Sequence, residues 1–324
     1  MSKNTLFVGI DVSKDTFDVY EPSMGHQKFK NDKEGFRLFH KWLNKDCWCV
    51  IENTGSYHQP LAFFLLKKKY SVSVVNALVV KRFIQMKLQR NKTDKSDAKM
   101  IAMYGSNQPL ELWEPDPEYI DCCKMLQSCI QTYFKQQTAL SNKLHSLKSK
   151  GSEYRVLVNS IQRQKKSIQS EIQKLEEALE TLIKENEPEM LSQLTSIPGI
   201  GRKTAIFLIV SSNAFKNFES AGQLKSFYGL APTERSSGSS VRGVSRISKS
   251  GNALIRNHLF MCSFTACQCN PACKSLYERL VAKGKSKKLA LIAVCNKLII
   301  QAYSIAKSGL MYDENYKSRL IVKG

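Results

Sequence analysis

Thr5 to Asp11 read T-L-F-V-G-I-D, a short apolar run that ends on an acid. Two further strand-like segments follow at Thr16 to Tyr20 and His26 to Phe29, separated by turn residues. Phe36 to Leu43 carry apolar residues at helical spacing, and Cys47 to Ile51 form another strand-like run. A helix, a strand and a helix are then predicted at Leu61 to Leu66, Ser71 to Val75 and Val79 to Met86. Three strands followed by alternating helices and strands predict an α/β domain with a mixed sheet.

Two acids stand at the carboxyl ends of separate predicted strands, Asp11 and Glu52. That edge of an open α/β sheet is where ligands bind. Asp94 lies near the start of a predicted helix, T-D-K-S-D-A-K-M-I-A-M, and Asp97 shares its face three residues further on. Taken singly, Asp94 is equally well explained as a helix cap and Asp97 as a partner of the helix dipole.

Four acids at element ends of one lysine-rich domain favour a carboxylate cluster that binds metal. Clustered carboxylates repel one another unless a divalent cation neutralises them. Hard oxygen ligands with open coordination positions select Mg²⁺ or Mn²⁺. Two such ions about 4 Å apart stabilise the attacking and leaving oxygens in phosphoryl transfer, and one ion is enough where the protein supplies the nucleophile.

The chain of 324 residues has the length of two or three domains, and its hydrophobic share of 42% is ordinary. Its charge is unusual, because 49 Lys and Arg stand against 28 Asp and Glu, a formal net charge of +21. Twenty of the basic residues but only five of the acids lie in 191–324. An excess of one sign attracts a polyanion, so nucleic acid is the first expected partner and an anionic membrane surface the second.

The membrane alternative is weakened by the longest apolar run, Leu289 to Ile305, which polar residues interrupt and which falls short of a span. Met1 to Asn4 lead directly into a strand without a signal-peptide segment, so a cytoplasmic protein is expected. Its ten cysteines are then mostly reduced thiols. The four cysteines from Cys262 to Cys273 contain no C-x-x-C pair, which favours small buried hydrophobic residues over zinc ligands.

Trp113 to Pro117, W-E-P-D-P, form a rigid extended segment that marks a domain boundary. Beyond it, apolar residues recur at alternating spacings of four and three from Leu126 to Leu147 and again from Tyr154 to Leu182. These heptads predict two helices of about 30 residues in a coiled-coil arm. The narrow seam fits an intramolecular hairpin and an oligomerisation arm equally well. We therefore expect three domains, 1–115, 116–188 and 189–324.

Leu194 to Val210 contain the turn P-G-I-G between apolar helical flanks and resemble a helix-hairpin-helix element. In such an element, a glycine turn and the following helix N-terminus offer backbone N–H groups to a DNA phosphate. The same letters also occur in a plain tight turn. The residues expected to make the contact are Gly199, Gly201, Arg202 and Lys203.

The segment Glu234 to Gly251 reads E-R-S-S-G-S-S-V-R-G-V-S-R-I-S-K-S-G and holds seven serines, three arginines and three glycines. Glycine and serine disfavour both helix and strand, so a loop is predicted. It is either a flexible linker or a surface that binds phosphate and places hydroxyl groups next to it. The flanking sequence predicts a mainly helical C-terminal domain, with helices at Phe215 to Leu230, Leu254 to Cys269, Leu276 to Val281 and Leu289 to Ala306.

A second basic segment, A-K-G-K-S-K-K at Ala282 to Lys288, is either a solvated loop or a contact to the phosphate backbone. The net charge of this third of the chain favours the contact. In the two basic segments, the residues expected to bind nucleic acid are Arg235, Arg242, Arg246, Lys249, Lys285, Lys287 and Lys288.

Six short motifs follow one another over nearly the whole chain. They are G-I-D-V-S-K (Gly9 to Lys14), I-E-N-T-G (Ile51 to Gly55), R-N-K-T-D-K-S-D-A (Arg90 to Ala98), S-I-P-G-I-G (Ser196 to Gly201), G-L-A-P (Gly229 to Pro232) and S-G-S-S-V-R-G-V-S-R (Ser237 to Arg246). In this order and spacing the chain resembles the DEDD-motif insertion-sequence transposases, the bridge-RNA-guided recombinase family. Over Tyr119 to Pro188 only the heptad pattern supports the resemblance.

The resemblance implies that Asp11, Glu52, Asp94 and Asp97 are the four acids of a RuvC-like, RNase-H-fold metal site. It also implies that Ser237 attacks a DNA phosphodiester, leaving a transient phosphoserine–DNA link and a free 3′-hydroxyl. Strand exchange through a Holliday-type junction would follow. A structured RNA encoded by the element would pair with donor and target DNA. The protein would act as a homo-oligomer, a dimer that assembles to a tetramer.

A serine hydroxyl is a poor nucleophile unless a base or a metal lowers its pKa, and no histidine lies near Ser237 in the sequence. Activation by Mg²⁺ on the carboxylates is therefore the simpler hypothesis, with Arg242 and Arg246 stabilising phosphate charge. Neighbouring serines compete with Ser237 on chemistry alone, and only the resemblance selects it. The alternatives are a metal-dependent nuclease, such as a junction resolvase that uses water, and a non-enzymatic protein that coats nucleic acid.

Overall fold

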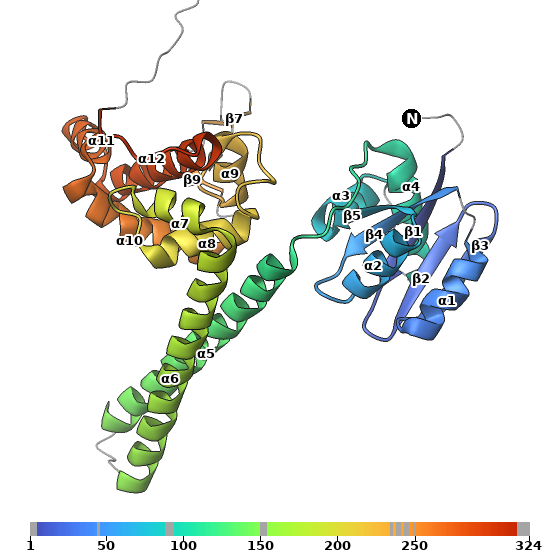
Figure 1. The fold of residues 1–324 in the computed structure, drawn as a ribbon, viewed down its shortest axis with the longest axis horizontal. Helices are drawn as coiled ribbons and strands as arrows, with labels where there is room; N and C mark the ends of the chain where they lie inside the picture. Colours follow the sequence, from blue (N-terminus) through green and yellow to red (C-terminus); the bar gives the residue numbers. More distant parts are fainter. Residues whose placement is uncertain are drawn as a thin grey trace, which may run out of the picture. The chain divides into compact units, whose positions relative to one another are not determined.

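The structure is a computed structural model that describes residues 5–43, 46–87, 94–149, 154–233, 236–237, 241–242, 246–248 and 251–315. At Asp94, 236–237 and 241–242 it describes the backbone alone. The chain divides into two compact units, Met1–Pro115 and Asp116–Gly324 (Figure 1). The boundary falls within the W-E-P-D-P segment, where the backbone forms neither helix nor strand.

A five-stranded mixed sheet forms the centre of the first unit, as the sequence predicted (Figure 1). Its strands are β1 Leu6–Val12, β2 Thr16–Glu21, β3 Gly25–Lys30, β4 Cys47–Asn53 and β5 Ser71–Asn76. The strand order is β3-β2-β1-β4-β5. β2 is antiparallel to both β1 and β3, whereas β4 is parallel to both β1 and β5.

The two faces of the sheet carry separate cores. Val8, Ile10 and Ile51 belong to the larger core, which includes residues of α1 Lys33–Trp42 and α2 Gln59–Lys67. A smaller core on the other face contains Val50 and residues of two further helices, α3 Ala77–Met86 and α4 Asp94–Asn107. Alternation along β1 and β4 thus sends one set of side chains toward α1 and α2 and the other toward α3 and α4.

The second unit begins with two long helices, α5 Glu118–Ser149 and α6 Arg155–Asn186, which pack along each other (Figure 1). Each has 32 residues, close to the length that the heptads predicted. The intramolecular hairpin is therefore the arrangement that the structure contains. Ile130 of α5 and Ile172 of α6 belong to the same buried core as the C-terminal helices, so the base of the arm is continuous with them.

Six further helices lie in the described residues of the second unit. They are α7 Pro188–Thr195, α8 Arg202–Ser212, α9 Ala221–Phe227, α10 Ala253–Cys269, α11 Pro271–Ala282 and α12 Lys287–Ser308. The predicted helix at Phe215 to Leu230 is wrong in its first part, because only Ala221–Phe227 is helical. Asn213, Ala214 and Phe215 all have positive φ, and the Ser220 hydroxyl caps α9 by accepting from the Gln223 N–H at 3.2 Å.

Helix α12 corrects a second expectation. In the part of the chain that the structure describes, it is the one helix long and apolar enough to cross a membrane, with 22 residues. The apolar run therefore does not fall short of a span by length. Val294, Leu298 and Ala302 of this helix are nevertheless fully buried in the core of the second unit. Its apolar character is that of a core helix.

The cysteines from Cys262 to Cys273 are all free thiols. Cys262 and Cys273 are buried and Cys267 is half-buried, but Cys269 is exposed at the end of α10. Burial raises the pKa of Cys273 to about 12, because the thiolate would be poorly solvated there. The buried cysteines are packing residues, as expected, whereas Cys269 is exposed and is not a packing residue.

Candidate active site and nucleic-acid interface

The predicted acids of β1 and β4 come side by side near the carboxyl ends of the two strands. The strands pair in parallel with Ile10 opposite Ile51, so Asp11 and Glu52 are the next residues along each strand. Ile10 and Ile51 point into the core under α1 and α2. Because side chains alternate between faces, Asp11 and Glu52 belong to the opposite face, which α4 covers.

Helix α4 crosses that face in the direction opposite to β1. A methyl group added to Gly9 would stand 2.1 Å from the Ala98 carbonyl oxygen. One added to Gly105 would stand 3.1 Å from Phe7 Cδ1. The early part of α4 therefore lies over the later part of β1, and the N-terminus of α4 is directed toward the strand ends that carry the acids.

Asp94 is the first residue of α4, and Asp97 lies in the same turn with a partly buried side chain. The backbone thus brings Asp11, Glu52, Asp94 and Asp97, the four DEDD acids, to one end of the sheet. Among the side chains that the structure describes, which exclude that of Asp94, no three His, Cys, Asp or Glu groups gather as a metal site.

A fifth acid, Asp18, has no counterpart among the acids predicted from the sequence. It lies on β2 directly opposite Asp11, hence on the same face, and is only 6% exposed. Its carboxylate contacts His26 Nε2 at 2.7 Å and Lys28 Nζ at 3.3 Å. The sequence did contain a signal, because Asp18 stands between the apolar residues Phe17 and Val19 of a strand. Its side chain must point to the opposite face of the sheet, and a buried carboxylate there needs polar partners.

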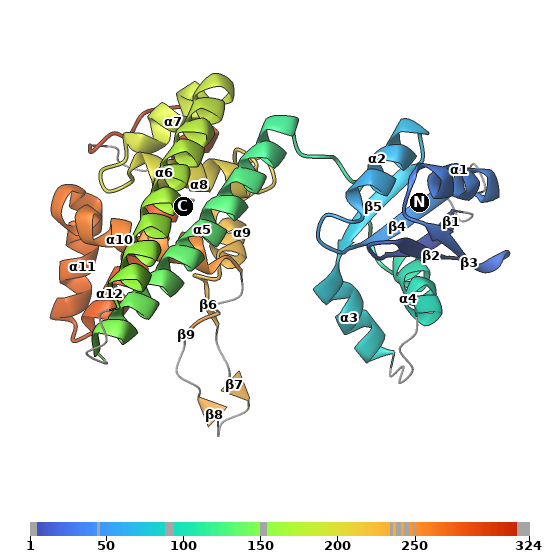
Figure 2. The same ribbon diagram turned by 90° about the horizontal axis from the view of Figure 1, so that it is seen from below.

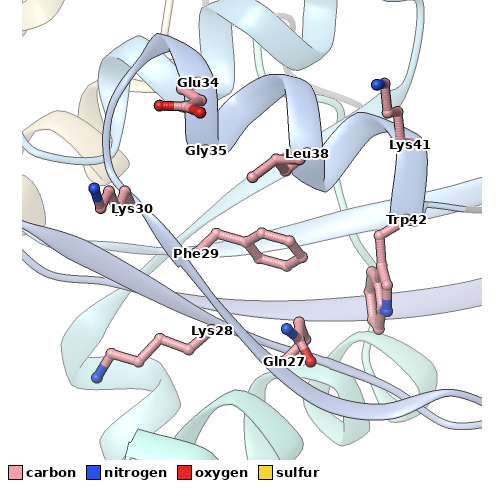
Figure 3. Close-up of a pocket in the computed structure, with 9 residues that line it drawn as sticks. All are labelled: Gln27, Lys28, Phe29, Lys30, Glu34, Gly35, Leu38, Lys41 and Trp42. Atoms are coloured by element: carbon pink, nitrogen blue, oxygen red, sulfur yellow. The ribbon is translucent and has the colours of Figure 1, made fainter.

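The first unit also has a basic groove that the sequence did not indicate. It lies between β3 and α1 and encloses about 590 Å³. In Figure 3, Phe29 and Leu38 lie in the middle of the groove, with Lys30 and Glu34 at one end and Lys41 at the other. Because β2 separates β3 from β1, this groove is not part of the acidic site.

The serine-rich segment contains two short antiparallel ladders. β6 Pro232–Thr233 pairs with β9 Arg246–Ile247, and β7 Ser236–Ser237 pairs with β8 Val241–Arg242. Figure 2 shows β7 and β8 beyond β6 and β9. These four strands are here called the serine ribbon. The described residues 236–237, 241–242 and 246–247 of the predicted loop are therefore in paired strands.

Ser237 stands in β7 opposite Val241, and Arg242 stands opposite Ser236. Arg246 is exposed in β9, nearer the base of the ribbon. Arg235 and Lys249, which were also expected to bind nucleic acid, lie outside the described residues.

The P-G-I-G turn joins α7 to α8 and packs against α10. Gly199 has φ +103°, and a methyl group added to it would stand 2.7 Å from Ala266 Cβ. A close approach to α10 therefore explains this glycine by itself. Gly201 precedes α8 in extended conformation and, having no side chain, provides no side-chain cap for the first N–H groups of the helix.

Arg202 and Lys203, the basic residues expected beside this turn, contact acids of α6. Lys203 Nζ lies 2.7 Å from Glu176 Oε1, and Arg202 Nη1 lies 3.3 Å from Glu180 Oε1. Both cationic side chains are 68% exposed, so a phosphate can still reach them. Burial of the imidazole lowers the pKa of His258, and the nearby charge of Lys203 lowers it further.

The lysine turn, Ala282 to Lys288, joins α11 to α12. Lys285, Lys287 and Lys288 are all exposed. Ser286 caps α12 by accepting from the Leu289 N–H at 3.4 Å, so Lys287 and Lys288 stand in the first turn of the helix. Cations are unfavourable there because the helix dipole is positive at its N-terminus. An anion at this position would relieve that repulsion.

Two known protein families match successive parts of the chain. Residues 8–148 match the model of the IS110-type DEDD proteins, which is described as a transposase. Residues 191–278 match the model of the transposase IS116/IS110/IS902 family. The chain belongs to this transposase family. The first match contains Asp11, Glu52 and Asp97, and the second contains the serine ribbon, so the protein is a DNA transposase or recombinase.

Individual relatives agree with the family. The transposase is 29% identical over 328 residues to the pilin gene-inverting protein of Moraxella bovis, with 97% of this chain and 99% of that protein covered. It is 22% identical over 328 residues to the transposase for insertion sequence element IS1111A of Coxiella burnetii, covering 91% and 88%. A 43.6 kDa protein of insertion element IS110 from Streptomyces coelicolor matches at 33% over 120 residues, 37% of this chain and 29% of that protein.

Proposed function

We propose that the transposase is an RNA-guided recombinase in which Ser237 is the nucleophile and the four DEDD acids hold Mg²⁺ in a RuvC-like domain. Its partners are donor DNA, target DNA, an element-encoded structured RNA and further copies of the chain. The observation that carries the proposal is the parallel register of β1 and β4, which places Asp11 beside Glu52 under the N-terminal end of α4.

The donor set fits a hard divalent cation. Asp11 and Glu52 offer carboxylate oxygens from neighbouring strands, and Asp97 adds one from the helix that crosses them. The order β3-β2-β1-β4-β5 is compatible with the RNase H fold that the resemblance implied. When bound, Mg²⁺ would lower the pKa of a nearby hydroxyl and stabilise charge on the phosphate. Asp18, already paired with His26 and Lys28, would adjoin this set without being needed as a ligand.

The proposed chemistry of Ser237 follows from a segment whose sequence supplies hydroxyls and guanidinium groups. The Ser237 Oγ would form a bond to phosphorus as the bond from phosphorus to the 3′ oxygen breaks. The serine proton would pass to solvent, and the 3′ oxygen would leave as a hydroxyl by gaining a proton. Arg242 and Arg246, on the strands β8 and β9 of the same ribbon, are the proposed partners of the phosphate charge.

Two surfaces of the second unit are the proposed DNA contacts. The N-terminus of α8 offers backbone N–H groups together with Arg202 and Lys203. The lysine turn adds three exposed ammonium groups where the dipole of α12 also favours an anion.

Trapping the reaction in denaturant tests the nucleophile. We expect wild-type protein to become covalently attached to the DNA strand that it cleaves, and Ser237→Ala to lose both the attachment and the cleavage. Asp11→Ala and Glu52→Ala should lose both activities while DNA binding is retained. Full cleavage by Ser237→Ala would instead identify a nuclease in which water attacks. Normal function of the acid variants would identify a protein that only coats DNA.

Purification from cells that carry the complete element tests the guide. We expect one discrete RNA, encoded by DNA that flanks the gene, to co-purify with the transposase and to be recovered by sequencing. Random cellular RNA alone would remove the guided part of the proposal and leave the serine chemistry untouched.

A further inference from the structure

The base of the serine ribbon is fastened to the body of the second unit on the side where the chain enters. The Asn296 amide of α12 donates to the Leu230 carbonyl oxygen at 3.2 Å. The Ser248 N–H donates to the Ala231 carbonyl oxygen at 3.2 Å, which joins the returning strand to the entering one. The Thr233 hydroxyl donates to the Arg246 carbonyl oxygen at 2.9 Å. These bonds fix how β6 and β9 lie together.

The side where the chain leaves the ribbon depends on a close backbone contact. Gly251 has φ +99°, a conformation that residues with a Cβ rarely adopt. A methyl group there would stand 2.0 Å from the Phe227 carbonyl oxygen at the end of α9. The ribbon therefore returns to the body directly against the helix that precedes it.

One side chain joins these two pieces of backbone. Arg256, in the first turn of α10, donates from Nη1 to the Tyr228 carbonyl oxygen at 3.0 Å and to the Gly251 carbonyl oxygen at 3.1 Å. The guanidinium is half-buried, and hydrogen bonds from a charged donor are stronger than neutral ones. Arg256 thus ties the end of α9 to the exit of the ribbon, while Asn252 caps the same helix one turn earlier.

We propose that Arg256 is a positioning residue of the transposase, which sets the direction of the serine ribbon and thereby the place of Ser237. The inference rests on the proposed role of Ser237. In this role Arg256 acts through the backbone at Tyr228 and Gly251, to which it donates, and not through contact with the reacting groups. Its loss frees the exit of the ribbon and loosens the nearby Ser248 bond, while the Asn296 bond to Leu230 still holds the entrance, so we expect the ribbon to turn about its base rather than detach.

The expected effect falls on the chemical step. A displacement of about 1 Å between reacting groups costs about 100-fold in rate, whereas the proposed DNA contacts at the P-G-I-G turn and the lysine turn lie on other elements. We therefore expect Arg256→Gln to form the covalent protein–DNA link about 100-fold more slowly at saturating DNA, with DNA affinity changed less than about threefold. Arg256→Lys should recover part of the rate, because an ammonium donates to the same carbonyl oxygens without the planar fork.

The experiment compares single-turnover formation of the link, DNA affinity and thermal midpoint for full-length wild type, Arg256→Gln, Arg256→Lys and Arg279→Gln. Arg279 is exposed on α11, so its variant removes the same charge without touching the ribbon. Gly251→Ala disturbs the same contact with Arg256 intact and should reproduce the slow chemistry. Gly309→Ala is its control, since Gly309 also has positive φ (+70°) but its nearest neighbouring atom is a Gln193 nitrogen at 3.9 Å.

Hydrogen exchange in the DNA-free protein gives a reading that does not depend on the chemistry. The N–H of Ser248 should lose protection in Arg256→Gln, but not in Arg279→Gln, because the exit of the ribbon then moves. A wild-type rate of link formation together with unchanged protection in Arg256→Gln would overturn the inference. If wild-type protein forms no link at all, the proposed role of Ser237 fails, and the exchange data alone then decide whether Arg256 orients the ribbon.

Discussion

At the scale of single residues, Gly9 decides how closely α4 approaches β1. Its backbone conformation is ordinary, so the requirement for glycine is one of space. The Ala98 carbonyl and the Ala102 amide of α4 fill the position that a Cβ would take, at 2.1 and 2.3 Å. The glycine two residues before Asp11 therefore allows the helix that carries Asp94 and Asp97 to lie on the strand.

Gly9→Ala should destabilise the first unit and abolish DNA cleavage. The added methyl meets backbone atoms, which cannot rotate away, so α4 must lift from β1 and carry Asp97 from Asp11. We expect the free energy of unfolding to fall by about 3 kcal/mol. Urea unfolding followed by tryptophan fluorescence measures this for the first unit, because Trp42, Trp48 and Trp113 all lie in it.

The matched control is Gly25→Ala, since Gly25 has φ +83° but no neighbouring atom within 4 Å. It should lose about 1 kcal/mol from conformational strain and retain cleavage. An equal loss of cleavage in both variants would show that the packing of α4 on β1 is irrelevant to the site.

The sequence was sufficient to place Asp11 and Glu52, because each follows an apolar run and parallel strands end at the same edge of a sheet. Asp18 could not be recognised in the same way. Its importance depends on which residue faces it across the β1 and β2 ladder and on cations brought by β3, and these are long-range pairings. Arg256 and Gly251 likewise acquire their contacts only when the two ends of the ribbon meet.

At the scale of elements, α6 and α8 face each other through opposite charges. Glu176 and Glu180 of α6 contact Lys203 and Arg202 at the N-terminus of α8. The arm therefore places two carboxylates beside the proposed phosphate site of the P-G-I-G turn. Exposed ion pairs are worth little in stability, so DNA can displace them, but their charges still oppose an approaching phosphate.

Glu176→Gln with Glu180→Gln should strengthen DNA binding. Removing two competing carboxylates frees Arg202 and Lys203 for phosphate, and we expect about fivefold higher affinity at low salt, with a smaller gain at high salt. Fluorescence anisotropy with labelled duplex DNA measures the change. The control is Glu177→Gln with Glu185→Gln, which removes the same two charges from exposed positions of α6. Equal gains in both double variants would mean that net charge alone is responsible.

Regular periodicity was the part of the element pattern that the sequence could predict. Seven-residue spacing gave α5 and α6 with lengths within a few residues, because packing of two helices on one seam depends on local repeats. The start of α9 was missed, since three consecutive residues with positive φ follow α8 without glycine among them. The β6 and β9 ladder was missed because its pairing is fixed by contacts at the base of the ribbon rather than by strand propensity.

At the scale of the whole molecule, the residues of the proposed chemistry are divided between the two compact units. The first unit carries the four DEDD acids, and the second carries Ser237, the P-G-I-G turn and the lysine turn. The excess of positive charge is concentrated in 191–324. Lysines of the second unit should therefore contribute more to DNA affinity than an equal number of lysines in the first unit.

Replacing Lys285, Lys287 and Lys288 by glutamine tests this division. The logarithm of the affinity falls with the logarithm of the salt concentration, with a slope of about −0.9 for each ammonium group paired with a phosphate. The triple variant should therefore have a slope that is shallower by about 2.7. A control of the same charge is available in Lys67, Lys68 and Lys69, three exposed lysines at the end of α2 in the first unit. Their replacement should leave the slope nearly unchanged. If both triple variants lower the slope equally, the polyanion is bound by total charge, and the lysine turn has no special part in holding DNA.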